Sequence, residues 1–168
     1  MKERPILFNG EMVRAILDGR KTQTRHIVRH AIKGAPKCIM FDNRNNRPLS
    51  SIWADDEGMF SCPFGKPDEQ FWVRESIQAA QEVCKFGIRY LADGAIRWLG
   101  REHDEQWLSM DDYRGAEGAT VPSIHMPRWA SRITLKITNV RVERLNNISK
   151  KDAIAEGSPP SHPSIDAI

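Results

Sequence analysis

The sequence lacks the features that mark secreted and membrane proteins. Its three cysteines, Cys38, Cys62 and Cys84, are an odd number at wide spacing with no CxxC pair, which argues against a disulfide framework and for reduced thiols. No apolar run approaches the ~18 residues needed to cross a membrane. The N-terminus shows neither the apolar core nor the cleavage site of a signal peptide. These absences predict a cytoplasmic protein without a membrane partner.

The common cofactor and metal motifs are missing as well. The sequence contains no P-loop and no dinucleotide-binding glycine pattern. His103 and His125 lie far apart, and no His/Cys pair stands at three- or four-residue spacing around them, as a zinc site would require. We therefore expect no metal and no cofactor.

The bulk composition is that of an ordinary globular protein. The chain has 168 residues, of which 40% are hydrophobic and 28% charged, and this suits one domain with a buried core. We expect that domain to cover residues 1–157. The segment 158–168 contains three prolines and is predicted to be a tail. No internal repeat is present.

Acidic residues are absent between Gly19 and Phe41, although the net charge of the whole chain is only +3. This stretch carries eight basic or histidine side chains: Arg20, Lys21, Arg25, His26, Arg29, His30, Lys33 and Lys37. Such a run predicts a local positive potential that attracts phosphates or other anions. The alternative is a solvated basic loop.

Helix and strand signals are short and spaced along the chain. Asn9 is a good helix N-cap, the apolar residues Met12, Val13, Ile16 and Leu17 share a helical face, and Gly19 stands where a helix ends. The β-branched segment 22–28 predicts a strand leaving that helix. Apolar runs at 51–53 and 59–62 predict a hairpin.

Further strands are predicted at 70–74 and 87–91. The segment 97–122 is interpreted as a long irregular connection with one helical turn. The clearest strand is Ser131–Leu145, whose alternation shifts at Asn139 and so indicates a bulge. Ser149 and Asp152 form a capping-box pattern that predicts a helix ending at Gly157. The chain is therefore predicted to be mostly β (α+β), with two or more short helices.

Four motifs in this order resemble a known family. They are Gly19–Arg25 after an amphipathic helix, Phe71–Glu75, His125–Arg132 and Val142–Gly157. Together they resemble the ASCH domain family of the PUA-like superfamily, and in particular the longer ASCH proteins of prophages. The likeness is close over 4–30, 70–77 and 124–157. It implies a PUA-like small β-barrel and an RNA-associated role.

Two differences from the longer ASCH proteins stand out. Where those proteins have the second arginine of a Thr-Arg-Arg motif, this chain has His26. They also continue past the Glu-Gly stop with a helix and a closing strand, a segment we expect to be missing from this chain.

The resemblance also implies candidate catalytic residues. One bacterial branch resembles an amidohydrolase that removes acyl groups from N4-acylated cytidine, and its catalytic group falls on Lys21, Thr24 and Glu156. A threonine hydroxyl needs a neighbouring base, and lysine is a base only when neutral, which burial and nearby cations favour. On a regular strand, residues three apart face opposite ways. Lys21 and Thr24 therefore converge only if the turn after the helix breaks the alternation.

A second set of residues is predicted to bind a nucleotide. Arg20 and Arg25 would contact phosphate, with His26, Glu75 and Trp72 completing the site. Glu75 is also the alternative acidic member of the site or a partner of the two arginines, and Trp72 is alternatively a residue of the barrel core or rim.

Three functions remain open at this level. The favoured one is binding of a nucleoside or single-stranded RNA at the basic site Gly19–Arg25. The runner-up is a metal-independent amidohydrolase of the N4-acetylcytidine type. The third is a non-catalytic phage accessory protein that acts through protein contacts. The oligomeric state is not predicted.

Overall fold

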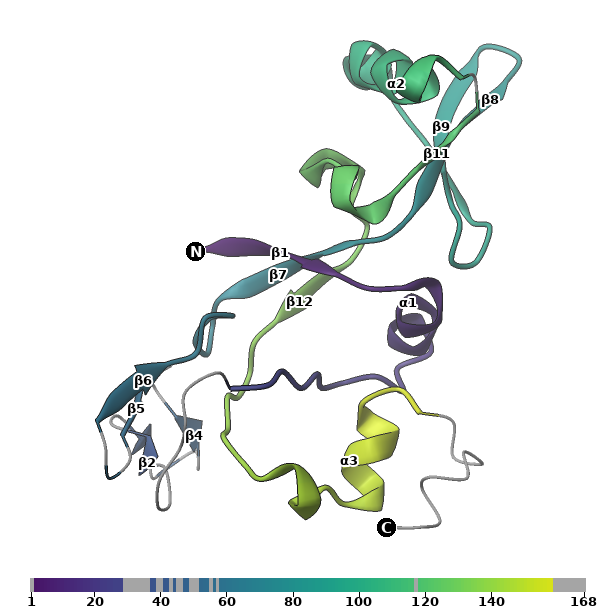
Figure 1. Ribbon diagram of the computed structural model, residues 1–168. Coiled ribbons are helices and arrows are strands. Elements are labelled where there is room, and N and C mark those ends of the chain that lie inside the picture. The colour runs from purple at the N-terminus through teal and green to yellow at the C-terminus, as the bar shows by residue number, and fades with distance from the viewer. Residues whose placement is uncertain are drawn as a thin grey trace. The chain divides into compact units, whose positions relative to one another are not determined.

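The computed structural model describes residues 2–28, 37–38, 41–42, 44, 47–48, 52–54, 56, 58–116 and 118–158 (Figure 1). The chain divides into two compact units, each built from separate segments. Unit 1 comprises Met1–Arg4, Thr22–Phe71 and Thr134–Ile168, and unit 2 comprises Pro5–Lys21 and Trp72–Ile133. Each unit is described by itself below. One domain over 1–157 stays a prediction.

The described residues form a mixed α+β structure that is rich in short strands. The α-helices are α1 (Gly10–Leu17), α2 (Asp104–Asp111) and α3 (Lys150–Ala155). The strands are β1 (Glu3–Leu7), β2 (Lys37–Cys38), β3 (Phe41–Asp42), β4 (Arg47–Pro48), β5 (Ile52–Ala54), β6 (Met59–Ser61), β7 (Gln70–Arg74), β8 (Ile77–Glu82), β9 (Lys85–Tyr90), β10 (Ile96–Trp98), β11 (Thr120–Val121) and β12 (Thr134–Lys136). Short 3₁₀ helices are Arg101–His103, Tyr113–Gly115, Ser123–His125, Arg128–Ala130 and Leu145–Asn147.

These strands form separate sheets, with orders β1-β7-β12, β10-β9-β8-β11, β2-β5-β6 and β3-β4. None of these sheets closes on itself within the described residues, so the predicted barrel is not seen there. The boundary between the units falls inside β1 and inside β7, because each of these strands contains residues of both units.

Unit 2 is organised around the antiparallel hairpin of β8 and β9. The two strands pair from Ile77 opposite Tyr90 to Glu82 opposite Lys85. The short strands β10 and β11 flank them. Strand β9 was predicted from the sequence, whereas β8 was not. The segment 97–122, expected to hold one helical turn, forms the two-turn helix α2, part of β10 and all of β11.

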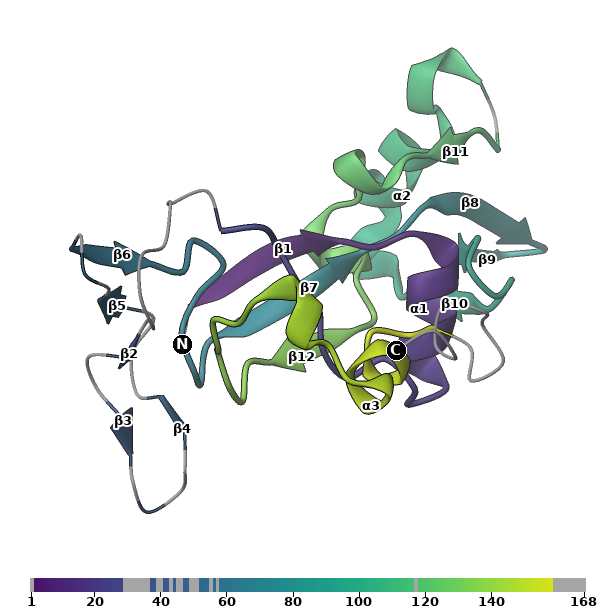
Figure 2. The same ribbon diagram turned by 60° about the horizontal axis from the view of Figure 1, so that its bottom comes forward.

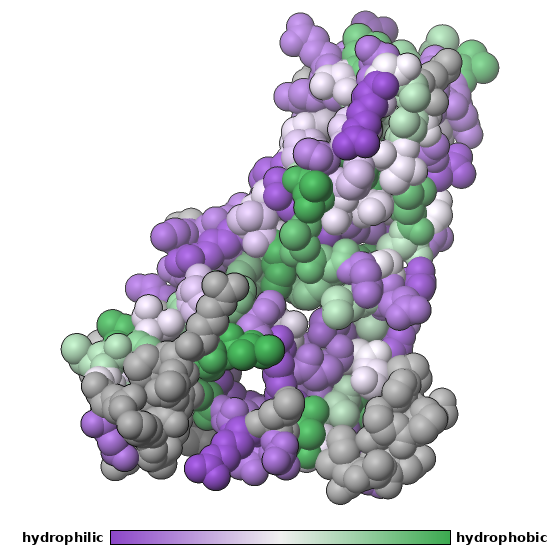
Figure 3. Space-filling model, in the orientation of Figure 1, coloured by the Kyte–Doolittle hydropathy of each residue, from purple (hydrophilic) through white to green (hydrophobic). Residues whose placement is uncertain are grey.

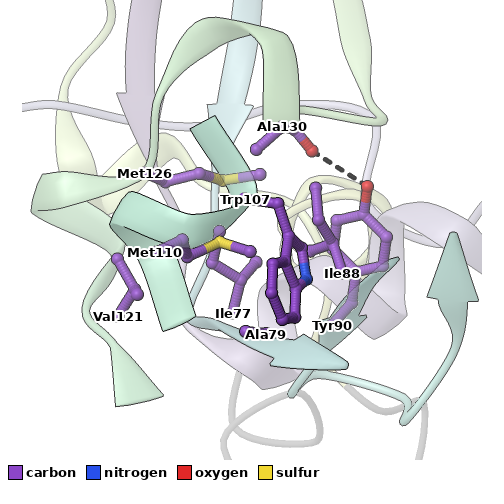
Figure 4. Packing of buried hydrophobic residues seen from close by; sticks show 9 residues of the cluster. All are labelled: Ile77, Ala79, Ile88, Tyr90, Trp107, Met110, Val121, Met126 and Ala130. Atoms are coloured by element: carbon purple, nitrogen blue, oxygen red, sulfur yellow. Dashed lines mark hydrogen bonds between the residues drawn. The ribbon is translucent and has the colours of Figure 1, made fainter. Parts of the chain in front are cut away.

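A cluster of buried apolar side chains holds α2 against this hairpin (Figure 4). Trp107 and Met110 are three residues apart and therefore point from the same face of α2; they are 2% and 5% exposed. The indole Nε1 of Trp107 donates to the Gly87 carbonyl at 2.9 Å. The Tyr90 hydroxyl donates to the Ala130 carbonyl at 2.9 Å, so both polar atoms of these large rings are satisfied inside the core.

Helix α1 begins where the sequence predicted. The Asn9 side chain accepts a hydrogen bond from the Met12 amide at 2.8 Å, and Gly19 ends the segment with φ of +72°. Its buried residues are Val13 and Ala15, whereas Met12 and Leu17 are 39% and 48% exposed. The predicted apolar face is therefore only partly the buried one.

In unit 1, the predicted hairpin around Gly58 is confirmed. Strands β5 and β6 pair antiparallel, with Trp53 opposite Phe60, and β2 pairs with the other edge of β5. The short strands β3 and β4 form a separate antiparallel pair, with Phe41 opposite Pro48 (Figure 2). Residues 29–36 of the basic run, with Arg29, His30 and Lys33, lie outside the described residues.

The prediction of a strand over 22–28 is wrong. These residues belong to no strand, because their first amides bond to a helix instead. The Thr22 and Gln23 amides both donate to the Ala155 carbonyl, at 2.8 and 3.0 Å. They thereby satisfy one of the carbonyls that the last turn of α3 leaves open.

Helix α3 confirms the capping-box prediction. The Ser149 side chain accepts from the Asp152 amide and the Asp152 side chain accepts from the Ser149 amide. The helix ends at Ala155 with Glu156 as its C-cap, and Gly157 follows with φ of +99°. The predicted strand Ser131–Leu145, in contrast, is reduced to Thr134–Lys136. The 137–138 segment follows as irregular chain, in which Ile137 still bonds with Asp68 and Glu69 backbone groups.

Within the described residues, no helix is long and apolar enough to cross a membrane. The part of unit 2 that carries α2, at the top of Figure 3, displays mainly hydrophilic residues.

Candidate nucleobase pocket and its surroundings

An open pocket of about 480 Å³ lies on unit 1 and is lined by Arg25, His26, Ile27 and Phe64. Three of these residues come from the irregular segment that follows Gln23, and Phe64 comes from the loop after β6. Because the 22–28 segment does not alternate as a strand, successive side chains of this segment line the same pocket.

Two rings stack at this pocket. The His26 and Phe64 rings lie 3.8 Å apart between centroids and only 17° from parallel. His26 is exposed, Phe64 is 37% exposed, and the neighbouring Ile27 is 93% exposed. Unit 1 therefore presents flat aromatic and apolar surface to solvent at this place.

The loop that carries Phe64 is anchored on both sides. Arg4 Nη1 donates to the Pro63 carbonyl at 3.1 Å, and Arg4 Nη2 pairs with Glu69 Oε2 at 3.3 Å. Gly65 has φ of +132°, and a Cβ there would stand 2.9 Å from Glu69 Oε2 and from Ile137 Cδ1. The positive φ favours glycine at this position, next to Phe64 in a loop that Arg4 ties to the rest of unit 1.

The charge around Arg25 differs from the sequence expectation. Its guanidinium lies 2.7 Å from Glu143 Oε1 and 3.7 Å from carboxylate oxygens of both Asp152 and Glu156. Arg141 joins the same group, at 2.6 Å from Asp152 and 3.3 Å from Glu143. Carboxylates therefore outnumber arginines in this cluster, and the positive charge of Arg25 is compensated inside the protein.

The hydrogen bonds of the cluster shift its pKa values so that the charged forms of its side chains are favoured. Bonds from Ser149, Arg141 and Gln23 hold the pKa of Asp152 well below its ordinary value. The bond to Asp152 raises the pKa of Arg141. The carboxylate and the guanidinium thus remain charged around neutral pH, and the cluster stays intact there.

The predicted catalytic residues fall in different units. Lys21 is in unit 2, only 7% exposed, with its Nζ 5.6 Å from the Phe8 ring centroid. Thr24 is exposed in unit 1, and Glu156 is the C-cap of α3 in unit 1. The hydrolytic group of Lys21, Thr24 and Glu156 stays a prediction.

Arg20, predicted to contact phosphate, pairs with the nearby Asp18 at 3.0 Å on the surface of unit 2. Lys21 is buried and Arg25 is surrounded by carboxylates. The basic run of the sequence is therefore partly compensated by acids from elsewhere in the chain, which the local charge pattern does not reveal.

Glu75 belongs to an ion network inside unit 2. It is 1% exposed, and Arg132 donates to its two oxygens at 2.8 and 2.9 Å. Arg132 also bonds Asp93 at 2.9 and 3.0 Å and lies 4.0 Å from the Tyr90 ring centroid. Within unit 2 the partner of Glu75 is therefore Arg132 and not Arg20; its pairing with Arg25, which belongs to unit 1, stays a prediction.

The pKa values in this network follow from burial and pairing. Burial raises the pKa of the Tyr90 hydroxyl. Hydrogen bonding to Arg132 lowers the pKa of Asp93. Burial acts to lower the pKa of Arg132, but the bonds to Glu75 and Asp93 outweigh it and the pKa is raised.

Trp72 is in unit 2 and is 8% exposed. Arg74 and Arg128 both lie against its ring. This burial agrees with the alternative of a core residue and leaves little ring surface for a base.

Several residues of these sites were not predicted from the sequence. Phe64 lies in no motif or predicted element, and its loop is anchored by Arg4 and Glu69. Glu143 was one acid inside an expected strand. A weak signal existed for Arg132, since it ends the His125–Arg132 motif.

No family model, no curated protein and no solved structure matches this chain. Among the described residues, no group of three or more His, Cys, Asp or Glu side chains is arranged to hold a metal ion.

Proposed function

We propose that unit 1 binds a nucleobase, either of a nucleoside or of single-stranded RNA, at the pocket of Arg25, His26, Ile27 and Phe64. The observation that carries this proposal is the stacked His26–Phe64 pair, 3.8 Å between centroids, at an open pocket. Flat aromatic side chains on the surface are how proteins hold unpaired bases.

The size and the composition of the pocket support a ligand as large as a base. Its volume of about 480 Å³ lies within the ~300–1,000 Å³ of small-molecule sites. Ile27 adds apolar surface beside the rings. Stacking of a base on an aromatic side chain contributes about 1–3 kcal/mol, and the other residues that line the pocket supply the rest of the binding energy.

The charges favour a neutral ring over a phosphate at this pocket. Arg25 is paired with Glu143 and lies near two more carboxylates, and these acids would repel a phosphate that approached it. Binding here should therefore depend only weakly on salt, in contrast to binding that neutralises phosphates.

The resemblance to the ASCH family is part of what we propose. A PUA-like barrel of prophage origin with an RNA-associated role agrees with a base-binding surface. The mixed α+β architecture and the short strands are compatible with it.

The proposal is tested by titrating the protein with cytidine, uridine, adenosine and guanosine while following the His26 ring signals by NMR. We expect saturable shifts for the wild type and a Kd about 5- to 150-fold weaker in Phe64→Ala, since that substitution removes one stacking contact. Met59→Ala is the matched control, because Met59 is a 74% exposed apolar residue of the same unit that does not line the pocket.

Absence of saturable shifts with any nucleoside, or equal losses in Phe64→Ala and Met59→Ala, would refute base binding at this pocket. The hydrolase alternative is examined with the same samples. Its specific support is the burial of Lys21, which is only 7% exposed and lies beside the Phe8 ring. Turnover of N4-acetylcytidine that is lost in Lys21→Ala would establish it, and inertness toward every nucleoside and RNA would favour the accessory role.

A further inference from the structure

We propose that Trp72, Arg74 and Arg128 form a phosphate-binding site on unit 2. This site differs from the base pocket in its residues, its unit and its chemistry, and it does not depend on the proposed function of unit 1.

Two guanidinium groups lie against one indole ring. The Arg74 Cζ is 4.8 Å and the Arg128 Cζ is 5.9 Å from the centroid of the Trp72 ring. Both distances are within the ~6 Å over which a cation is attracted to an aromatic face. The ring thus brings two positive charges together and offsets part of their mutual repulsion.

Arg74 is oriented by the core of the unit. Its Nε donates to the Met126 carbonyl at 3.2 Å, and Met126 itself is fully buried. One face of the guanidinium lies on Trp72 and one N–H is used by this carbonyl. The four N–H groups on Nη1 and Nη2 remain, in the planar arrangement that binds two phosphate oxygens at once.

The carboxylates near this site do not neutralise Arg74. Glu75 follows it in the chain, but both Glu75 oxygens accept from Arg132. Within the described part of the chain, Arg74 forms no ion pair. A half-buried arginine that is fixed in position and lacks a carboxylate partner has the charge and geometry for an anion, and phosphate fits its fork.

The phosphate has two sources, a nucleic-acid backbone or a free phosphate compound, and the experiment separates them. The first probe is a dye-labelled oligomer of abasic phosphodiester units, which carries backbone phosphates but no bases, followed by fluorescence anisotropy. The second probe is inorganic phosphate, followed through the arginine Nε–Hε signals by NMR. Neither probe contains a base, so neither reports on the pocket of unit 1.

We expect the wild type to bind at least one probe and Arg74→Gln to bind it about tenfold or more weakly, as loss of a charged hydrogen bond implies. For the oligomer, the slope of log affinity against log salt should also fall by about 0.7, the value for one phosphate contact on a single strand. Arg89→Gln is the control: it removes the same charge from an exposed position of unit 2 and should change the affinity less than about twofold.

Arg128→Gln should weaken binding as well, and because Arg128 is exposed this variant tests the site even if Arg74→Gln fails to fold. A preference for the oligomer identifies a nucleic-acid backbone, and saturation by inorganic phosphate alone identifies a free phosphate compound; both outcomes support the site. Equal losses in Arg74→Gln and Arg89→Gln, or no interaction with either probe, would overturn it.

Discussion

Arg132 is the side chain on which the polar interior of unit 2 depends. It satisfies both oxygens of the buried Glu75, reaches Asp93 and covers one face of Tyr90. A buried ion pair need not make a protein more stable than an apolar pair of the same shape, but removing one partner leaves an uncompensated charge in the core.

We therefore expect Arg132→Met to lower the free energy of unfolding by about 3–5 kcal/mol, since Glu75 is left charged and unpaired. The double variant Glu75→Leu/Arg132→Met should recover much of the loss. Chemical denaturation monitored by circular dichroism measures both, with Arg89→Met as the control for an exposed arginine. A loss below about 1 kcal/mol would mean that water or another group takes over from Arg132.

Asp152 gives a prediction on pH. Its pKa is lowered in the folded protein by Ser149, Arg141 and Gln23, so its ionised form stabilises the fold at pH values above the unfolded pKa of about 3.9. That contribution is lost as the pH falls further, toward the folded pKa. Asp152→Asn should accordingly be less stable than the wild type at pH 7, and the difference should shrink below about pH 4.

Unfolding curves at pH 7, 5, 4 and 3 measure this difference. Asp56→Asn, a change at an exposed acid of unit 1, is the control. A difference between Asp152→Asn and wild type that stays constant down to pH 3 would contradict the assigned role of the Asp152 charge.

At the scale of elements, local signals decided what was predictable. Capping side chains act within a few residues, and so α1 and α3 were predicted from Asn9 and from Ser149 with Asp152. The β5–β6 hairpin was likewise predicted, from the two apolar runs at 51–53 and 59–62. The 22–28 segment was not, because its β-branched residues suit a strand while its amides find the Ala155 carbonyl, a partner more than 130 residues away in the chain.

The same logic limits what the sequence says of the site. The stacked rings of His26 and Phe64, and the acids around Arg25, come from segments far apart in the chain. Neither a charge run nor a strand pattern contains that information. The acids that compensate Arg25 come close only in the folded chain. For this reason the proposed phosphate contacts are Arg74 and Arg128 and no longer Arg20 and Arg25.

The last turn of helix α3 and the residues Thr22 and Gln23 should open together. Ser149→Ala removes the N-cap and costs about 1 kcal/mol, so the last turn of α3 should fray more often. Hydrogen exchange of the Thr22 and Gln23 amides, which donate to Ala155, should then become about fivefold faster. The amide of Ile88, in the β8–β9 hairpin of unit 2, is the control and should keep its rate. Unchanged exchange at residues 22 and 23 would show that these amides do not depend on α3.

The whole chain consists of two units that share strands. Because β1 and β7 each contain residues of both units, we expect a single cooperative unfolding transition. Four of the five tryptophans, Trp72, Trp98, Trp107 and Trp129, belong to unit 2, so tryptophan fluorescence reports mainly on that unit. NMR signals of Phe64 and His26 report on unit 1. Coincident midpoints are expected, and separated midpoints would show two independently stable units.

The anchoring of the Phe64 loop has a consequence for the N-terminal strand. Arg4 holds the Pro63 carbonyl and the Glu69 carboxylate, so a residue near the start of the chain fixes a ring sixty positions away. Shortening the protein past residue 4, or replacing Arg4 by alanine, would loosen that ring without altering any atom of the pocket. A weaker ligand affinity in such a variant would then come from greater motion of the Phe64 ring and not from the loss of a contact with the ligand.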